Sequence, residues 1–362
     1  MVMKDNFWST TFWTITIALL IGAGAGILAT SYTSSYLEEY AIELSRLTAP
    51  LRLTQTEPKS FPSSLEDAIR RFNTDNLSSI VSIYPPNLTR PFGFKRDDLL
   101  ASGLVLTSDG WILAPKQTKA FYSKSVVVIG DKTYPVETIV EDTGSDVVFI
   151  KIQADSLNIV GFGSGLNISI ADQVLVTSAS GVIQVRTVLS KSTTQSLLIS
   201  SDRLYQTVVL ENMINEPSFV FSLGGDLIGF VSDTKETEPV VILSESFLPQ
   251  FRSLLETGVV HQPSLGLETV SLNSSVGMSN EVKRSRKYGA YVPDQRSIFK
   301  KGPAETAGIK PLDIILSYNG QALNGDHTLD QFVVQSKVGD QILLTIDREG
   351  EELDVKVILG EL

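Results

Sequence analysis

Short runs rich in β-branched residues begin after Asn76 and recur as far as Val231. Turn signals such as Ser108-Asp109-Gly110 separate them, and no regular helical pattern lies between them. Many short strands without intervening helices are typical of a β-barrel or β-sandwich. We therefore predict a mainly β fold with strands at Ser79–Tyr84, Leu99–Leu106, Trp111–Leu113, Ser125–Ile129, Val147–Ile152, Gln173–Thr177, Val182–Leu189, Ser196–Ile199, Gln206–Leu210 and Leu227–Val231.

Helical patterns lie on both sides of this β-rich region. Ser64 precedes an amphipathic stretch, and Asp67 three residues later completes a start that resembles a capping box. A second stretch with helical spacing ends at about Thr257. The residues beyond it mix strands with two short helices, which predicts a second, smaller domain.

The composition excludes several classes of function. The 362 residues are 42% hydrophobic, and 30 basic against 41 acidic side chains give a net charge of −11. Binding of nucleic acid is not expected, because phosphate recognition needs a basic field. Cysteine is absent, and histidine occurs only at His261 and His327. We therefore expect no metal site and no cofactor, and a histidine base would have to be one of these two.

The N-terminus is predicted to be a membrane anchor. No charged residue occurs from Asn6 to Leu37, and the apolar run Phe12–Ala29 is close to the roughly 20 residues that cross a bilayer. A cleaved signal peptide is the alternative, although no clear small-x-small cleavage site follows the run. We expect residues 1–35 to form a cytoplasmic tip and a single membrane span, and residues 36–63 a helix and linker. The flanking charges favour a main body on the extracytoplasmic side.

Three segments carry a resemblance to a known family. They are Ala101–Pro115 (ASGLVLTSDGWILAP), Glu141–Ile152 (EDTGSDVVFIKI) and Lys300–Gly320 (KKGPAETAGIKPLDIILSYNG). Together they resemble the HtrA (DegP/DegQ-like) family of serine proteases. The resemblance implies a trypsin-like double β-barrel at residues 64–258, with a Ser-His-Asp triad at its seam. It also implies an α+β PDZ domain at residues 259–362.

When the family's triad is placed on this sequence, the catalytic centre is degenerate. The base position holds Gln117, whose amide does not titrate near neutral pH. The aspartate is kept as Asp146, but the nucleophile position holds Glu216. Ile214 replaces the glycine of the oxyanion hole, and Pro217 lacks a backbone N–H. We therefore predict no intact catalytic residue and no protease activity.

An unconventional site around Ser218 is the alternative, and it would make the chain an active serine endopeptidase. Against it, no histidine precedes His261, and Ser218 is followed by Phe219 rather than by glycine. A pairing of Ser218 with Lys116 has no spacing signature. We expect Ser218 to be a polar residue of a remodelled loop.

The PDZ half carries the intact motif. PDZ domains add a peptide's C-terminal strand to a sheet edge, and backbone N–H groups capture its carboxylate. A helix after Thr328 presents apolar residues at i, i+3 and i+4, and we expect at least one to line the groove rather than the core. The peptide-binding residues that the resemblance implies are Ser264, Leu265, Gly266, Leu267, Leu329, Phe332 and Val333.

The PDZ half also has a basic loop and one change from the family's sequence. Lys283, Arg284, Arg286 and Lys287 form a basic loop, which we expect to be a solvated insertion. The family's Gly-Asp pair before a buried strand is Leu312-Asp313 here, a change that we expect to affect a turn and not the groove.

These features predict a membrane-anchored pseudoprotease. Its PDZ domain would bind peptide C-termini or unfolded segments of partner proteins, in an adaptor, regulatory or chaperone-like role in envelope protein quality control. The resemblance also implies a homo- or hetero-trimer with HtrA-like proteases. A third hypothesis is a structural envelope protein whose PDZ domain no longer binds peptides.

Overall fold

The computed structural model describes residues 62–86, 93–116, 119–142, 144–193, 196–231 and 239–362. The predicted membrane anchor and the helix that follows it lie outside these residues. Among the helices of the described part of the chain, none has the length and apolar character needed to cross a membrane.

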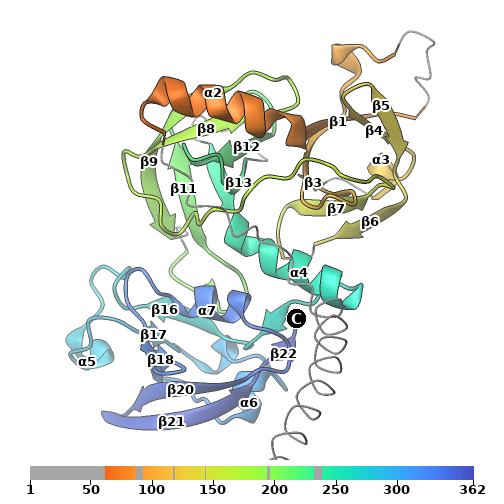
Figure 1. The fold of residues 1–362 in the computed structure, drawn as a ribbon. Coiled ribbons are helices and arrows are strands. Elements are labelled where there is room, and N and C mark those ends of the chain that lie inside the picture. Colours follow the sequence, from red (N-terminus) through yellow and green to blue (C-terminus); the bar gives the residue numbers. More distant parts are fainter. Residues whose placement is uncertain (1–61, 87–92, 117–118, 143, 194–195, 232–238) are drawn as a thin grey trace, which may run out of the picture. The chain divides into compact units, whose positions relative to one another are not determined.

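The first helix forms where the capping pattern predicts it. Helix α2 spans Leu65–Asp75, and Ser64 Oγ accepts a 3.1 Å hydrogen bond from the backbone N–H of Asp67. Its apolar face is buried through Phe72, whose ring lies 4.8 Å from that of Phe221. The helix therefore packs along the second of the two β-structures described below (Figure 1).

The first β-structure is a seven-stranded sheet with the order β5-β4-β1-β2-β3-β7-β6. Every neighbouring pair in it is antiparallel. Its strands are β1 (Ile80–Tyr84), β2 (Ala101–Val105), β3 (Trp111–Pro115), β4 (Val126–Ile129), β5 (Lys132–Pro135), β6 (Thr138–Glu141) and β7 (Val147–Lys151). The 3₁₀ turn η1 (Leu77–Ser79) leads from α2 into β1, and the 3₁₀ turn η2 (Arg96–Asp98) and the short helix α3 (Lys119–Tyr122) lie between strands.

The second β-structure is a closed barrel with the order β11-β14-β13-β12-β8-β9. Its strands are β8 (Gln173–Thr177), β9 (Gln184–Thr193), β11 (Gln206–Leu210), β12 (Ser218–Phe221), β13 (Leu227–Val231) and β14 (Val240–Leu243). The turn η3 (Ser244–Ser246) leads into helix α4 (Leu248–Thr257), which Gly258 ends in the left-handed conformation with φ of 80°.

One hydrophobic core joins the sheet and the barrel. Leu104, Leu113 and Phe149 of the sheet pack in the same buried cluster as Phe219 and Phe230 of the barrel. All five side chains are almost completely shielded from solvent. Each such side chain contributes about 1.5–3 kcal/mol to stability, so this shared core fixes the two halves against each other.

The C-terminal region, where a PDZ domain is expected, is built on a sheet with the order β10-β16-β17-β18-β20-β21, in which β19 pairs with β18. These strands are β10 (Ile199–Ser200), β16 (Glu268–Ser271), β17 (Ala290–Tyr291), β18 (Ile314–Tyr318), β19 (Gln321–Ala322), β20 (Gln341–Arg348) and β21 (Glu351–Ile358). A separate pair is formed by β15 (Pro263–Ser264) and β22 (Gly360–Glu361). The helical segments are α5 (Asn280–Lys283), η4 (Gln295–Ser297), α6 (Pro303–Thr306) and α7 (Leu329–Gln335). Figure 1 shows β20 and β21 as one long hairpin.

Two segments differ from the sequence prediction. The strand expected at Ser196–Ile199 does not join the barrel: β10 at Ile199–Ser200 pairs with β16 of the PDZ sheet instead. Ser218 is not in a loop but is the first residue of β12, because the apolar run that follows it is a buried barrel strand. The loop was expected only because the family has its nucleophile loop at this position.

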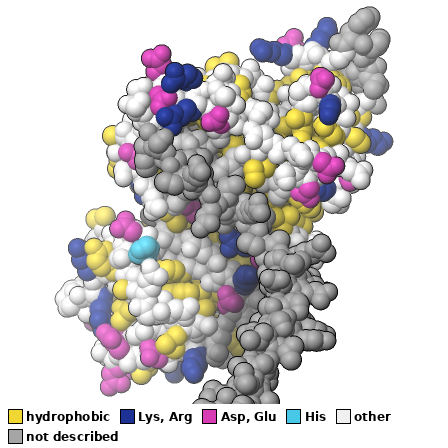
Figure 2. Space-filling view, viewed as in Figure 1, with side chains coloured by type: hydrophobic (Ala, Val, Ile, Leu, Met, Phe, Trp, Pro, Cys, Tyr) yellow, Lys and Arg dark blue, Asp and Glu magenta, His cyan; other side chains and the backbone are white. Residues whose placement is uncertain are grey.

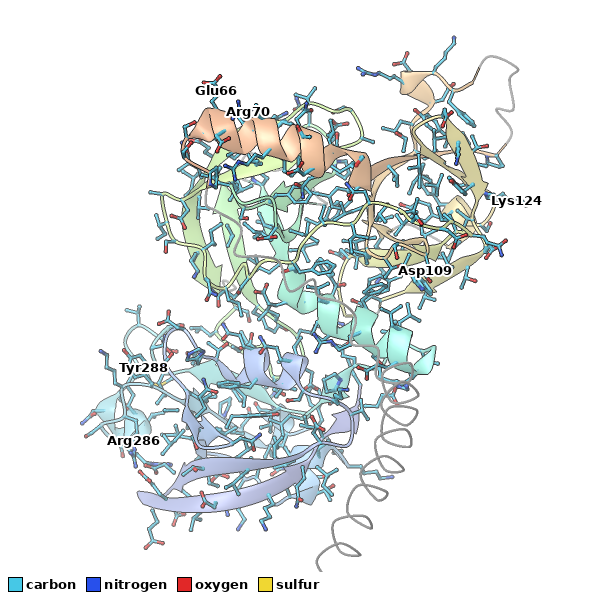
Figure 3. The ribbon with its side chains drawn as sticks, viewed as in Figure 1. Glu66, Arg70, Asp109, Lys124, Arg286 and Tyr288 are labelled. Carbon is cyan, nitrogen blue, oxygen red and sulfur yellow. The ribbon has the colours of Figure 1, made fainter. Side chains whose placement is uncertain are left out.

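The basic loop is also more than a solvated insertion. Arg284 and Arg286 both form ion pairs with the buried carboxylate of Asp347, at 2.9 Å and 3.0 Å. Arg286 also pairs with Glu352 at 2.7 Å. Figure 3 shows Arg286 beside Tyr288 at one end of the domain. The two arginines thus fasten the loop to the β20–β21 hairpin.

Candidate functional site

The strand register of the sheet places Asp146 next to Lys116, the residue before the expected base position. Pro115 at the end of β3 pairs with Val147 of β7, and the N–H of Lys116 donates a 2.8 Å hydrogen bond to the carbonyl of Asp146. The side chain of Asp146 is exposed in the turn before β7. Gln117 follows Lys116 but lies outside the described residues.

Glu216, at the expected nucleophile position, accepts a hydrogen bond from a group of serine hydroxyls. Ser178 Oγ donates a hydrogen bond to Glu216 Oε1 and lies 2.8 Å from Ser180 Oγ. The next residue, Ala179, donates its N–H at 2.9 Å to Ser102 Oγ on β2. The half-buried Glu216 carboxylate is therefore held by the loop after β8, beside the contact between sheet and barrel.

Ser218 is buried, with 3% of its surface exposed, and its Oγ donates a 2.8 Å hydrogen bond to the carbonyl of Glu216. A carbonyl oxygen cannot take up the proton that a nucleophilic serine must lose. The imidazole of His261 lies against Glu361, with Nδ1 2.7 Å from Oε1, and His327 stacks on Phe332. Both histidines belong to the PDZ region, so neither is arranged as a base for Ser218. Lys116 directs its Nζ to the carbonyl of Asp142 at 3.2 Å.

The segment expected to correspond to the oxyanion hole packs into the core of the barrel. Ile214 is 2% exposed and lies in the core of the barrel together with Leu210 and Val220. Its side chain fills space where the family's glycine has none. Pro217 follows without an N–H to donate. The segment expected to form the oxyanion hole therefore carries a buried side chain at Ile214 and lacks an N–H at Pro217, whereas an oxyanion hole needs N–H donors.

The loop expected to bind a peptide's carboxylate holds a side-chain carboxylate of this same chain. Gly266 has φ of 76°, a conformation that favours glycine, and this turns consecutive N–H groups in one direction. The N–H of Leu265 donates to Asp202 Oδ1 at 2.8 Å, and the N–H of Gly266 donates to the same carboxylate at 3.2 Å. Ser264 Oγ donates to Asp202 Oδ2 at 2.6 Å. The N–H of Leu267 donates to Ser201 Oγ at 3.1 Å.

The three residues of helix α7 that were expected to bind peptide, Leu329, Phe332 and Val333, differ in their burial. Val333 is wholly buried in the core of the domain, and Phe332 is half-buried, stacked on Tyr318 with 5.2 Å between ring centroids. Leu329 is also in the core but lines a small cavity next to Ile199. Leu329 is thus the one of the three that lies next to Ile199 of β10, and Leu265 and Leu267 belong to the same core.

Three residues of these sites had no signal in the sequence. Ser178 and Asp202 lie in loops of the barrel, and their partners are distant along the chain. Asp330 on α7 accepts a 3.0 Å hydrogen bond from the N–H of Tyr205, and its burial raises the pKa of its carboxyl. No local pattern pairs residues 62 or 125 positions apart.

A β-sheet and a closed β-barrel that share a core, followed by a PDZ fold, define a trypsin-like serine protease architecture with a PDZ domain. The comparisons with known proteins agree with this class. The family model for the PDZ domain matches residues 263–359.

Among curated proteins, the chain is 25% identical over 272 residues to a "Probable periplasmic serine endoprotease DegP-like" of Hahella chejuensis (strain KCTC 2396). This alignment covers 72% of the chain and 57% of the relative. A protein with the same description from Marinomonas sp. (strain MWYL1) is 27% identical over 270 residues, with 72% and 56% covered. The chain thus spans about half the length of the curated relatives that it matches.

Solved structures support the same fold. "HtrA-type protease AlgW with tripeptide" has a TM-score of 0.60 at 18% identity and covers 83% of this chain and 97% of that one. "HtrA-type protease AlgW with decapeptide" has a TM-score of 0.57, also at 18% identity, with 83% and 99% covered. The comparisons support the predicted resemblance to HtrA-type proteases, and the fold is a trypsin-like protease fold followed by a PDZ domain.

Proposed function

We propose that this chain is a membrane-anchored HtrA-type homologue without protease activity, which binds C-terminal or unfolded segments of partner proteins through its PDZ domain. It would serve as an adaptor, regulator or chaperone-like component of envelope protein quality control. The proposal keeps the domain limits expected from the sequence, with an anchor at 1–35, a linker at 36–63, a barrel region at 64–258 and a PDZ domain at 259–362.

One observation carries the loss of activity. The chain has two histidines, and both are engaged in the PDZ region, on Glu361 and on Phe332. Loss of triad members costs on the order of 10⁶ in turnover in a comparable serine protease. Here the hydroxyl of Ser218 also donates to a carbonyl, and Ile214 occupies the oxyanion position. The alternative, an endopeptidase centred on Ser218, would need a base other than histidine.

Peptide binding is supported by the loop at Gly266, whose N–H groups hold a carboxylate. Two of the structural neighbours carry peptides according to their titles. The curated relatives are described as periplasmic, which agrees with a body on the extracytoplasmic side of the membrane. Charged side chains of both signs are interspersed on the face drawn in Figure 2. A homo- or hetero-trimer with HtrA-like proteases stays part of the proposal.

Proteolysis tests the first half of the proposal. The full-length protein and its Ser218→Ala and Asp146→Ala variants are incubated with a fluorescently labelled unfolded protein. We expect no cleavage above background from any of the three. Cleavage by the natural chain that disappears in Ser218→Ala would establish the alternative endopeptidase.

Peptide capture tests the second half and separates an adaptor from a structural protein. We expect full-length protein to retain peptides with free C-termini from a random library, and Gly266→Ala to lose them because the loop needs a positive φ. Gly181→Ala is the matched control, since Gly181 has the same φ of 76° in a loop of the barrel. Capture by none of the three would favour the structural hypothesis, and equal capture by all three would show that peptides do not bind through the Gly266 loop.

A further inference from the structure

We propose that residues 199–202 are an internal ligand of the PDZ groove, and that a partner's C-terminal peptide binds by displacing them. The inference deepens the proposed peptide-binding function and rests on it. It assigns an interaction surface, the edge of β16 with the loop at Gly266, and the kind of peptide that fits there.

The first observation is strand addition. β10 pairs antiparallel with β16, with Ile199 opposite Thr269 and Ser200 opposite Glu268. The N–H of Ser201 continues the ladder by donating to the carbonyl of Leu267 at 2.8 Å. A peptide bound by β-augmentation makes the same type of main-chain hydrogen bonds to an exposed sheet edge. A segment of the barrel region therefore occupies the edge that a partner strand would use.

The second observation is the carboxylate at the end of this segment. The side chain of Asp202 is wholly buried, and it accepts hydrogen bonds from the N–H groups of Leu265 and Gly266. Those N–H groups are the donors that would receive the terminal carboxylate of a peptide. Ser201 occupies the place of the last peptide residue, and the Asp202 carboxylate replaces the α-carboxylate that Ser201 lacks within a continuous chain.

The third observation is that the other wall of the groove also holds the segment. Ile199 lines a residual cavity of about 20 Å³ together with Leu323 and Leu329. That volume is about enough for one water molecule and not for a second peptide side chain. The N–H of Tyr205, just past the segment, donates to Asp330 on α7 at 3.0 Å. Both walls of the groove are thus engaged by the same stretch of chain.

The internal ligand indicates the chemistry of the partner. It has a carboxylate at the loop, a small hydroxyl residue before it and a branched apolar residue, Ile199, two positions earlier. A peptide that ends in -Ile-Ser-Ser with a free carboxylate reproduces this arrangement. Residues 197–201 have the sequence Leu-Leu-Ile-Ser-Ser, so the chain itself supplies the probe.

Occupancy of the groove by residues 199–202 lowers the apparent affinity of the PDZ domain for a partner's peptide. A site that is open for only a fraction of the time binds a ligand more weakly by that fraction. A change that weakens the internal ligand without altering β16 or the loop should therefore tighten the binding of a peptide. Binding of a peptide should in turn release the barrel segment from the PDZ domain.

The experiment measures the binding of fluorescent Leu-Leu-Ile-Ser-Ser with a free carboxylate to full-length protein by anisotropy. We expect Asp202→Asn, which keeps the side chain's size but removes its charge, to bind about tenfold or more tightly than the natural chain. Ile199→Ser, which leaves Asp202 in place, should act in the same direction. The C-terminally amidated peptide should bind more weakly to every protein.

Two variants serve as controls. Asp155→Asn makes the same substitution at an exposed aspartate of the barrel region. Lys337→Gln breaks a different contact to the PDZ domain, the 2.8 Å ion pair with Glu256. Both should bind the peptide as the natural chain does. Equal affinity of Asp202→Asn and the natural chain would overturn the internal ligand.

Hydrogen exchange tests the internal contact without any peptide. The amides of Leu265, Gly266 and Leu267 should be protected in the natural chain and should exchange at least about tenfold faster in Asp202→Asn, while β20 keeps its protection. Unchanged protection of the three amides would overturn the proposal. Faster exchange without peptide binding by any variant would support the internal contact and refute the proposed peptide-binding function, so the two failures are distinguishable.

Discussion

Oδ1 of Asp202, in a loop of the barrel region, accepts a 2.8 Å hydrogen bond from the backbone N–H of Leu265 in the PDZ domain. Both residues are completely buried. The Asp202 carboxylate is further bound by Ser264 Oγ and by Ser201 Oγ. A single side chain thus satisfies several donors that would otherwise face water or a peptide terminus.

Removal of this carboxylate should weaken the contact between the two regions. Asp202→Ala leaves the N–H groups of Leu265 and Gly266 and the hydroxyl of Ser264 without their acceptor. Each buried donor left without a partner costs about 1–3 kcal/mol. Because water can reach the donors once the contact opens, we expect a total loss of about 2–3 kcal/mol. Scanning calorimetry should resolve two unfolding transitions where the natural chain has one.

Asp155→Ala is the control for this prediction, because Asp155 is exposed on the same region. It should leave the calorimetric trace unchanged. A single transition at an unaltered temperature in Asp202→Ala would mean that the carboxylate does not hold the two regions together.

Asp330 should make stability depend on pH in the opposite sense to an ordinary ion pair. Burial raises the pKa of its carboxyl above the ordinary value of 3.8, against hydrogen bonds that include one from the Tyr205 N–H. A raised pKa contributes stability that is complete below pH 3.8 and is lost as the pH rises through the raised value. Asp330→Asn keeps an acceptor for Tyr205 and cannot ionise. We expect it to be about 1–3 kcal/mol more stable than the natural chain at neutral pH.

The measurement is the midpoint of urea unfolding between pH 4 and pH 8. The gap between Asp330→Asn and the natural chain should widen as the pH rises and then level off. Asp326→Asn, an exposed aspartate nearby in the sequence, should follow the natural chain throughout. A gap that is constant across the range would show that ionisation of Asp330 is not its cause.

The sequence was most informative where local chemistry decides the structure. The cap at Ser64 and the helix after it form as predicted, because the hydroxyl and its N–H partner are three residues apart. Most barrel strands were found from their apolar runs. Strands such as β5 (Lys132–Pro135) and β6 (Thr138–Glu141) were missed, because their largely exposed residues give no buried pattern.

The candidate sites were less predictable, because they depend on pairs far apart in the chain. The loop at Gly266 was found from its motif, but its carboxylate partner Asp202 is 64 residues away. β10 was expected to be a barrel strand, since its composition suits either sheet. Glu216 and Ser218 were assigned by counting from the family's motif, and only the fold places their hydrogen bonds on Ser178 and on the backbone.

Asp347 should stabilise the PDZ domain at neutral pH and not in acid. Its burial acts to raise the pKa of the carboxyl, but hydrogen bonds from Arg284 and Arg286 outweigh burial and hold that pKa below 3.8. A lowered pKa contributes stability that is present above pH 3.8 and is lost as the pH falls through the lowered value. Asp347→Asn should cost about 2 kcal/mol at pH 7, since two arginines lose a buried partner.

Chemical denaturation at pH 7 and at pH 3 checks this prediction, and the difference should shrink at the lower pH. Asp354→Asn on the neighbouring strand is the control, because Asp354 is exposed and bonds only to Thr345 Oγ1 among the described contacts. An equal loss in Asp354→Asn would attribute the effect to net charge rather than to the two arginines.

Leu312 is the residue at which this chain departs from the family's glycine before β18. Its φ of 71° lies in the left-handed region, which costs an L-residue with a side chain about 1–2 kcal/mol. The side chain is 53% exposed, so little packing offsets this cost. The N–H of Leu312 donates to the carbonyl of Val292, and the carbonyl of Leu312 accepts from the guanidinium of Arg284. Neither hydrogen bond involves the leucine side chain.

Leu312→Gly should therefore stabilise the protein, by about 0.5–1 kcal/mol after the greater chain entropy of glycine in the unfolded state is subtracted. Leu312→Ala is the matched variant, because it removes the same exposed side chain but keeps the Cβ that makes the conformation unfavourable. Urea unfolding should place Leu312→Gly above the natural chain and Leu312→Ala at or below it. If alanine stabilised as much as glycine, the gain would come from removing an exposed apolar side chain and not from the backbone conformation.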